Sequence, residues 1–277
     1  MHAPVDRPHD GPEDPARWGD LPRRVTSSLL LVPIVVLMMW LGGIVWSVTV
    51  AVTGIGLMIE WAALCGVMAP RRGWPGGVLL VVFALAWGSI MFGIATPPAV
   101  LAIYVALTVL ILVRPWLGLG LIYIGFAVWA MIWLRQGEDG YANLLFLFPV
   151  VWASDVGAYV IGRVLGGRKL APLISPGKTW SGAFGGVVAA CLTGGAIAGG
   201  LAGDPSRAVV VAALLSVVSQ IGDLGESWAK RHFGVKDSGN LIPGHGGLLD
   251  RLDGLMAASF VAAGLAVFAG PGQFLWR

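Results

Sequence analysis

Long apolar stretches recur along the chain, and polar or charged residues gather in the segments between them. Most of these stretches have roughly the 17 to 25 residues that a helix needs to cross the hydrocarbon core of a bilayer. The pattern predicts nine membrane-spanning helices, at residues 26–41, 44–67, 76–94, 98–113, 117–134, 142–162, 180–202, 207–228 and 252–270. We therefore expect an all-α, polytopic transmembrane helical bundle.

The chain divides into three regions by composition. Residues 1–24 are polar and Pro-rich and contain five of the fifteen carboxylates, which predicts a disordered cytoplasmic tail. Residues 25–140 form a first set of transmembrane helices, and residues 141–277 form a second set that contains the long polar loops. In the seventh predicted helix, small residues recur at intervals of four, which is typical of close helix packing: Gly182 with Gly186, and Gly195 with Gly199.

Composition and charge agree with this architecture and orient it. With 57% hydrophobic and 12% charged residues, the chain is not an ordinary soluble protein. If the N-terminus is cytoplasmic, only Arg135, Arg207 and Arg277 of the eighteen basic residues lie outside, as the positive-inside rule favours. The polar loops at residues 162–179 and 230–251 then face the cytoplasm.

Acidic residues concentrate in the second half of the chain. Beyond the tail, most carboxylates lie in one stretch: Asp155, Asp204, Asp223, Glu226, Asp237, Asp250 and Asp253. An ionised group at membrane depth is costly, so it tends to face a cavity, a partner or an ion. One helical face carries Asp223, Glu226, Ser227 and Lys230, at offsets of three, four and seven residues.

These acids have two interpretations that the spacing leaves open. Carboxylates suit Mg²⁺, and the nearby basic residues suit phosphate oxygens, so the region indicates metal-assisted phosphate chemistry. Alternatively, Asp223 and Glu226 pair with Lys230, while Asp250 and Asp253 cap the last helix.

Four further residues are candidates for the same region. Lys178 and Thr179 precede the seventh predicted helix, where they either hold phosphate or cap the helix. His245 lies among glycines and is a general base, a hydrogen-bond donor to phosphate or a structural residue. Glu60, within the second predicted helix, either bonds a neighbouring helix or borders the site.

Three sequence motifs make the chain similar to a known family. Residues 227–231 read SWAKR, residues 236–239 read KDSG, and residues 241–253 read LIPGHGGLLDRLD. Together they resemble the signature of the phosphatidate cytidylyltransferases, or CDP-diacylglycerol synthases. Supporting matches lie at residues 154–159, 162–163 and 175–180, so the resemblance covers roughly residues 150–255. The first 140 residues agree mainly in hydropathy and in Glu60 with Trp61.

The resemblance implies a reaction of CTP with phosphatidate that yields CDP-diacylglycerol and pyrophosphate and requires a divalent cation. Combining this reaction with the residues, we assign metal binding to Asp223 and Asp250, helped by Glu226 and Asp253, with Mg²⁺ as the cofactor and a second cation as an open alternative. The implied catalytic residues are Asp223, Asp250, Lys230, Arg231 and His245. The implied substrate-binding residues are Asp155, Lys178, Thr179, Ser227, Lys236, Asp237, Gly246, Gly247 and Arg251.

We expect CTP, phosphatidate and membrane lipids as partners and no nucleic acid, and the resemblance implies a homodimer. The expected location is the cell inner (plasma) membrane, with the active site facing the cytoplasm. The main alternative is an ion-coupled membrane transporter, in which Glu60 and Asp155 bind protons or sodium. A lipid kinase, another nucleotidyltransferase and a non-catalytic lipid-binding scaffold are further alternatives.

Overall fold

A computed structural model describes residues 32–66, 113–137, 139–201, 203–239 and 246–269 of the chain. It separates residues 1–37 from residues 38–277 as two units, and the architecture below is that of the second unit. The helices are α2 (Gly43–Leu64), α5 (Pro115–Gln136), α6 (Gly140–Leu165), α7 (Trp180–Gly200), α8 (Pro205–His232) and α9 (Leu249–Ala269). A shorter apolar helix, Val32–Leu41, precedes them. The predicted tail falls outside the described residues.

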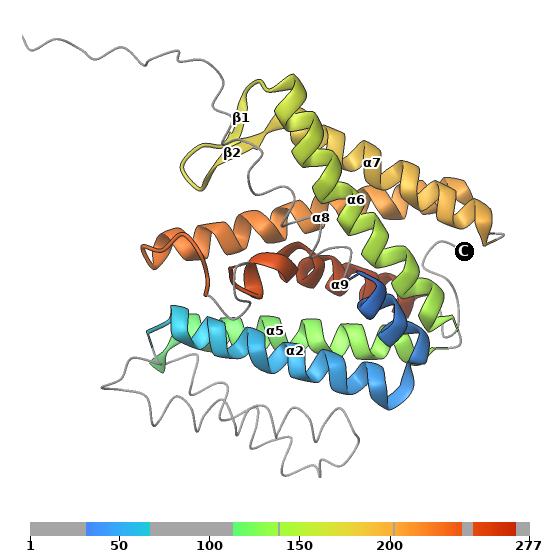
Figure 1. The fold of residues 1–277 in the computed structure, drawn as a ribbon, viewed down its shortest axis with the longest axis horizontal. Coiled ribbons are helices and arrows are strands. Elements are labelled where there is room, and N and C mark those ends of the chain that lie inside the picture. The colour runs from blue at the N-terminus through green and yellow to red at the C-terminus, as the bar shows by residue number, and fades with distance from the viewer. Residues whose placement is uncertain (1–31, 67–112, 138, 202, 240–245, 270–277) are drawn as a thin grey trace, which may run out of the picture. The chain divides into compact units, whose positions relative to one another are not determined.

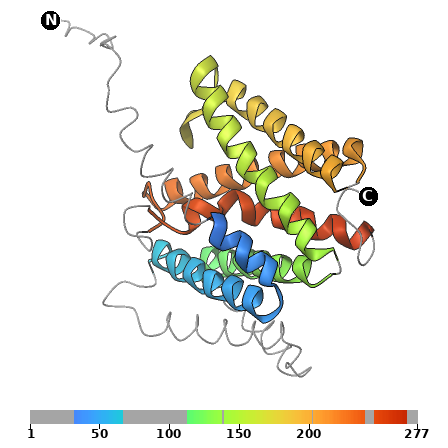
Figure 2. The ribbon, with the colours of Figure 1, turned by 45° about the vertical axis from the view of Figure 1, so that its right-hand side comes forward.

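Helix α9 packs against α2, α5, α6 and α8. Helix α2 packs on α5, both α5 and α8 pack on α9, and α6 and α8 both pack on α7. Figures 1 and 2 show the pair formed by α2 and α5 on one side of α9 and the group of α6, α7 and α8 on the other. Because α9 lies between these two groups, its first turn is within reach of side chains from both halves of the chain.

All six long helices are apolar and long enough to cross a membrane. Large apolar side chains are exposed on their outer faces, among them Phe184 (73% exposed), Leu192 (70%) and Val210 (68%). Such exposure is costly in water and favourable in lipid, so the chain is a membrane protein. The predicted nine spans are not confirmed, because two of them, at 76–94 and 98–113, fall almost wholly outside the described residues.

Two predicted boundaries differ in ways that matter for the site. Helix α8 continues to His232, so Lys230 and Arg231 are helical rather than part of a loop. Helix α9 begins at Leu249, which places Asp250 and Arg251 in its first turn. The apolar pattern misses both ends because the terminal turns are charged, whereas the 3.6-residue geometry continues through them.

The segment at residues 162–179, expected as a loop, contains a small β-hairpin that an all-α prediction does not include. Strand β1 (Lys169–Ala171) pairs antiparallel with β2 (Ser175–Thr179). Gly166 and Gly167, with φ of 57° and 103°, end α6 and turn the chain toward β1. The hairpin then leads directly into α7, where the side chain of Thr179 accepts a hydrogen bond from the Gly182 amide, 3.1 Å away.

Helices α6 and α7 cross at close range through glycine. A Cβ on Gly182 would lie 2.7 Å from the Ala158 carbonyl oxygen, and one on Gly186 would lie 2.8 Å from the Ser154 carbonyl oxygen. The predicted packing role of Gly182 and Gly186 is therefore confirmed. In the second predicted pair, a Cβ on Gly195 would be 3.3 Å from Val209, but one on Gly199 would meet no described atom within 4 Å.

Candidate active site

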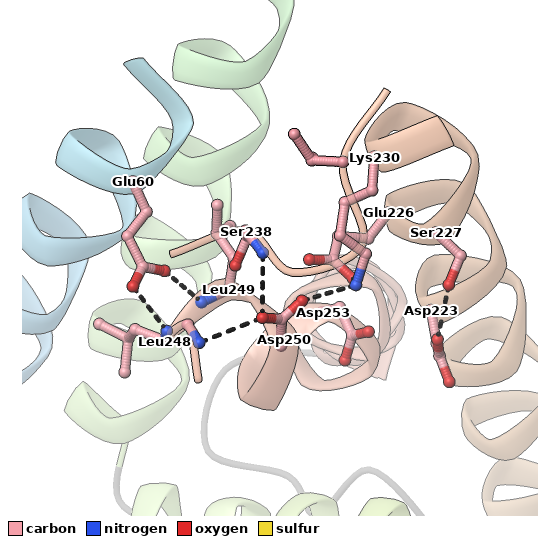
Figure 3. A network of polar contacts seen from close by, with 12 residues as sticks. Glu60, Asp223, Glu226, Ser227, Lys230, Ser238, Leu248, Leu249, Asp250 and Asp253 are labelled. Atoms are coloured by element: carbon pink, nitrogen blue, oxygen red, sulfur yellow. Dashed lines mark hydrogen bonds and ion pairs between the residues drawn. The ribbon is translucent and has the colours of Figure 1, made fainter. Parts of the chain in front are cut away.

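The predicted charged face of α8 is present near the helix end. The Ser227 hydroxyl donates to Asp223 at 3.5 Å, and the Lys230 ammonium lies 2.8 Å from a Glu226 carboxylate oxygen. Both contacts join residues four apart, one turn along the helix. Figure 3 shows Glu226 and Lys230 of α8 directed toward Asp250 in the first turn of α9, with Asp223 apart from them beside Ser227.

Asp250 connects α8, the polar loop and α9. Its Oδ1 accepts a hydrogen bond from Lys230 at 2.5 Å, and its Oδ2 accepts from the backbone amides of Ser238 and Gly247, each at 3.1 Å. A Cβ on Gly247 would lie 2.0 Å from the Ser238 hydroxyl oxygen and 2.8 Å from Asp250 Oδ2. Only glycine therefore fits at position 247, because the loop passes so close to this carboxylate.

Lys230 is shared by two acids. Its ammonium contacts Glu226 on its own helix and Asp250 on α9, and the side chain is only 12% exposed. The Glu226 and Asp250 carboxyl groups therefore face the same ammonium group. Two carboxylates beside one ammonium group carry a net negative charge. A second cation or a proton would balance it.

Two more acids approach this pair, one from α9 itself and one from α6. Asp253, one turn after Asp250 in α9, interacts electrostatically with Asp223, Glu226 and Asp155. Asp155 of α6 also interacts with Asp223. The structure thus brings acids from α6, α8 and α9 into one region, which we call the acidic cluster: Asp155, Asp223, Glu226, Asp250 and Asp253 (four of them labelled in Figure 3).

The β-hairpin adds a cation to the acidic cluster. Lys178 of β2 forms an ion pair with Asp223, with side-chain exposures of 25% and 36%. Thr179, the next residue, caps α7, so of its two predicted roles the structure shows capping. No helical spacing in the sequence relates Lys178 to Asp223, since the pair depends on how the hairpin folds back toward α8.

Glu60 reaches the same region from α2. Glu60 is buried, with 4% of the residue exposed, and its carboxylate accepts hydrogen bonds from the backbone amides of Leu248 at 2.9 Å and Leu249 at 2.8 Å. Of the two roles that the sequence left open, Glu60 therefore fulfils both: it bonds a neighbouring helix and it borders the acidic cluster (Figure 3). The feature of the sequence that pointed to Glu60 was its place as a single acid within a long apolar span.

The remaining predicted site residues lie further out or outside the described chain. Arg231 is exposed and donates to the carbonyl oxygens of Ile174 at 3.3 Å and Val235 at 3.2 Å. Lys236, Asp237 and Arg251 are exposed, and Gly246 adopts a φ of 83° just before Gly247. His245 falls outside the described residues.

The acidic cluster contains carboxylate oxygens that suit a cation, but its described side chains are not arranged as a set of metal ligands. Within the described ranges, no three His, Cys, Asp or Glu side chains are arranged to hold a metal ion. The carboxylates instead face ammonium groups: Asp223 faces Lys178, and Glu226 and Asp250 face Lys230. Glu226 Oε1 is buried and has no hydrogen-bond donor within the described chain. Hard oxygen atoms of this kind fit Mg²⁺.

Known proteins resemble this chain over most of its length. The sequence profile described as the Cytidylyltransferase family matches residues 22–268. A protein of Brucella melitensis named phosphatidate cytidylyltransferase is 41% identical over 264 residues, which cover 91% of this chain and 96% of the relative. One of the same name from Pseudomonas aeruginosa is 37% identical over 270 residues, covering 91% of this chain and 99% of the relative.

The match therefore includes both halves of the chain, from α2 with Glu60 to α9 with Asp250. The motifs and their supporting matches extended the resemblance only over roughly residues 150–255. Because the profile and the relatives extend over nearly the whole sequence, this chain belongs to the cytidylyltransferase family.

Proposed function

We propose that this protein is a CTP:phosphatidate cytidylyltransferase, which converts CTP and phosphatidate to CDP-diacylglycerol and pyrophosphate. The observation that carries the proposal is the acidic cluster with Lys178 and Lys230 at its edge, in a chain whose relatives bear this name. Family membership gives no support to the alternative of an ion-coupled transporter.

The reaction joins two anions, and that determines what the residues have to do. An oxygen of the phosphatidate phosphate forms a bond to the α-phosphorus of CTP, and the bond from that phosphorus to the β-phosphate oxygen breaks. Pyrophosphate leaves with the electron pair. The attacking phosphate is already largely ionised near neutral pH, so charge cancellation and alignment matter more than a strong base.

The lysines supply part of that cancellation. In the described arrangement Lys178 and Lys230 are held by carboxylates at the acidic cluster, so both are positioned before a phosphate arrives. We assign Lys178, Lys230, Arg231 and Lys236 to the phosphate groups of the two substrates. His245, Gly246 and Gly247 belong to the loop where backbone amides can approach the nucleotide.

The acids supply the ligands for Mg²⁺. Asp223 and Asp250 would hold it, with Glu226 and Asp253 as helpers, and a second cation is compatible with this number of carboxylates. A bound Mg²⁺ would neutralise phosphate charge and help stabilise the leaving pyrophosphate. Asp155, Thr179, Ser227, Asp237 and Arg251 complete the proposed substrate-binding set.

The proposed setting is the cell inner membrane, with the N-terminus and the acidic cluster on the cytoplasmic side and a homodimer as the assembly. The distribution of basic residues supports the orientation. CTP is water-soluble and phosphatidate is a membrane lipid, so a site at a membrane surface serves both.

The direct test is release of pyrophosphate by the purified full-length protein in detergent or lipid. We expect release that requires CTP, phosphatidate and Mg²⁺ together. Diacylglycerol in place of phosphatidate lacks the attacking phosphate and should give no product. If adding phosphatidate caused no pyrophosphate release from CTP, the proposed reaction would be wrong.

A further inference from the structure

The residue before helix α9 supplies no capping side chain. Leu248, which precedes the helix, has no side-chain acceptor, yet the amides of Gly247, Leu248 and Leu249 lie at the helix start and need acceptors. Asp250 accepts from the Gly247 amide, and Glu60 accepts from the other two. The first turn of α9 is therefore capped partly from within and partly by a side chain 188 residues earlier.

The position of Glu60 suits a side chain that accepts hydrogen bonds through two oxygens. It is 4% exposed and lies at the N-terminus of α9, where free amides and the helix dipole favour an anion. Its two hydrogen bonds, at 2.9 and 2.8 Å, use both carboxylate oxygens. A neutral amide could accept only one of them and would turn its own donor group toward the other amide.

The space around Glu60 is also closely fitted. A Cβ on Gly239 would lie 2.8 Å from Glu60 Oε1 and 3.0 Å from its carboxyl carbon. Gly239 directly follows Ser238, whose amide binds Asp250. Glu60 thus contacts both chain segments that hold the Asp250 carboxylate: the Ser238–Gly239 segment and the start of α9.

From this geometry we infer that Glu60 is a positioning residue for the proposed reaction. Through the amides of Leu248 and Leu249, it fixes the first turn of α9 so that Asp250 presents one oxygen to Lys230 and the acidic cluster (Figure 3). The first half of the chain thereby contributes to a site whose proposed catalytic residues all come from the second half. This role rests on the proposed function.

The experiment compares two helix caps. Asp204 caps α8 by accepting from the amides of Ser206 at 2.9 Å and Arg207 at 3.4 Å. It lies near the opposite end of α8 from Asp223, about 30 Å away at about 1.5 Å per residue. Glu60→Gln and Asp204→Asn each replace a capping carboxylate by its amide, so Asp204→Asn controls for the loss of a negative charge at a helix N-terminus as such.

Two measurements on the full-length protein separate a positioning role from a purely structural one. We expect Glu60→Gln to lower kcat for pyrophosphate release by about 10- to 100-fold and to raise the Mg²⁺ concentration needed for half-maximal rate. Hydrogen exchange measured by mass spectrometry should be faster at residues 246–251. Asp204→Asn should leave kcat and this exchange unchanged.

Wild-type kcat and unchanged exchange in Glu60→Gln would overturn the inference. So would equal losses of thermal stability in both variants with kcat unchanged in each. If Glu60→Gln is poorly folded, Gly239→Ala provides a second route, since its Cβ displaces the Glu60 carboxylate without removing the charge. Wild-type kcat in folded Gly239→Ala would also contradict the inference. A wild-type chain without turnover would instead refute the proposed reaction itself.

Discussion

Single charged residues at the acidic cluster have partners from different parts of the chain. Lys230 contacts one acid on its own helix and one on α9, while Asp223 contacts a hydrogen-bond donor on α8 and a cation on β2. A substitution here removes more than one contact, so the surviving partner is left with an unbalanced charge. Buried charges lose more stability when one partner is removed than exposed ones do.

Asp223→Asn tests the most connected acid of α8. The amide keeps the size of the side chain but loses the charge that faces Lys178 and that would hold a cation. We expect kcat for pyrophosphate release to fall by at least about 100-fold, while the amount of folded protein in the membrane stays near that of wild type. Near-normal turnover would remove Asp223 from the proposed metal site.

Lys236→Ala tests an exposed cation in the loop after α8. If Lys236 holds a CTP phosphate, its loss should raise the KM for CTP by about tenfold or more, the effect of one charge-assisted hydrogen bond. Thermal stability should not change. Lys169→Ala, which removes an exposed lysine of β1, is the matched control and should leave the KM unchanged. An equal KM for Lys236→Ala and wild type would argue against the assignment.

At the scale of elements, the sequence predicted what depends on local spacing. The charged face of α8 follows from offsets of three and four residues, and those contacts are present. The Lys178 ion pair and the Glu60 cap do not follow from spacing, because each depends on the tertiary packing of separate elements. The hairpin was missed for a related reason: its strands are too short for an alternating pattern, and Pro172 and Pro176 make the segment read as a loop.

The crossing of α6 and α7 gives a prediction about an element pair. Gly186→Ala would place a methyl group 2.8 Å from the Ser154 carbonyl oxygen, so the helices would have to separate. We expect a loss of about 1 to 3 kcal/mol in the free energy of unfolding, measured by denaturation in detergent. Gly199→Ala lies on the same helix, but its Cβ would meet no described atom within 4 Å. This substitution should leave the free energy of unfolding unchanged. Equal effects of the two substitutions would show that helix contact is not what requires glycine at position 186.

At the scale of the whole molecule, hydropathy predicted a helical membrane protein, and the six long apolar helices agree with it. The count of nine spans, the tail and the orientation stay predictions. They concern segments outside the described residues or the bilayer itself, and charge distribution bears on them only statistically.

Accessibility of introduced cysteines tests the orientation. The native Cys65 and Cys191 are free and would first be replaced by serine. In right-side-out membrane vesicles, we expect a membrane-impermeant maleimide to label Arg207→Cys directly and Lys169→Cys only after permeabilisation. Both positions are exposed, so a difference reports the side of the membrane rather than burial. The reverse pattern would place the acidic cluster on the external side.

The contact between Glu60 and the start of α9 bears on how small an active fragment of this protein can be. Every residue assigned to the proposed chemistry lies at position 155 or later, which would seem to make the first half dispensable. A fragment that began after α2, however, would leave the amides of Leu248 and Leu249 without their acceptor. If Glu60 positions Asp250 as we infer, the shortest functional version of this polypeptide has to retain α2, either on the same chain or supplied as a separate piece.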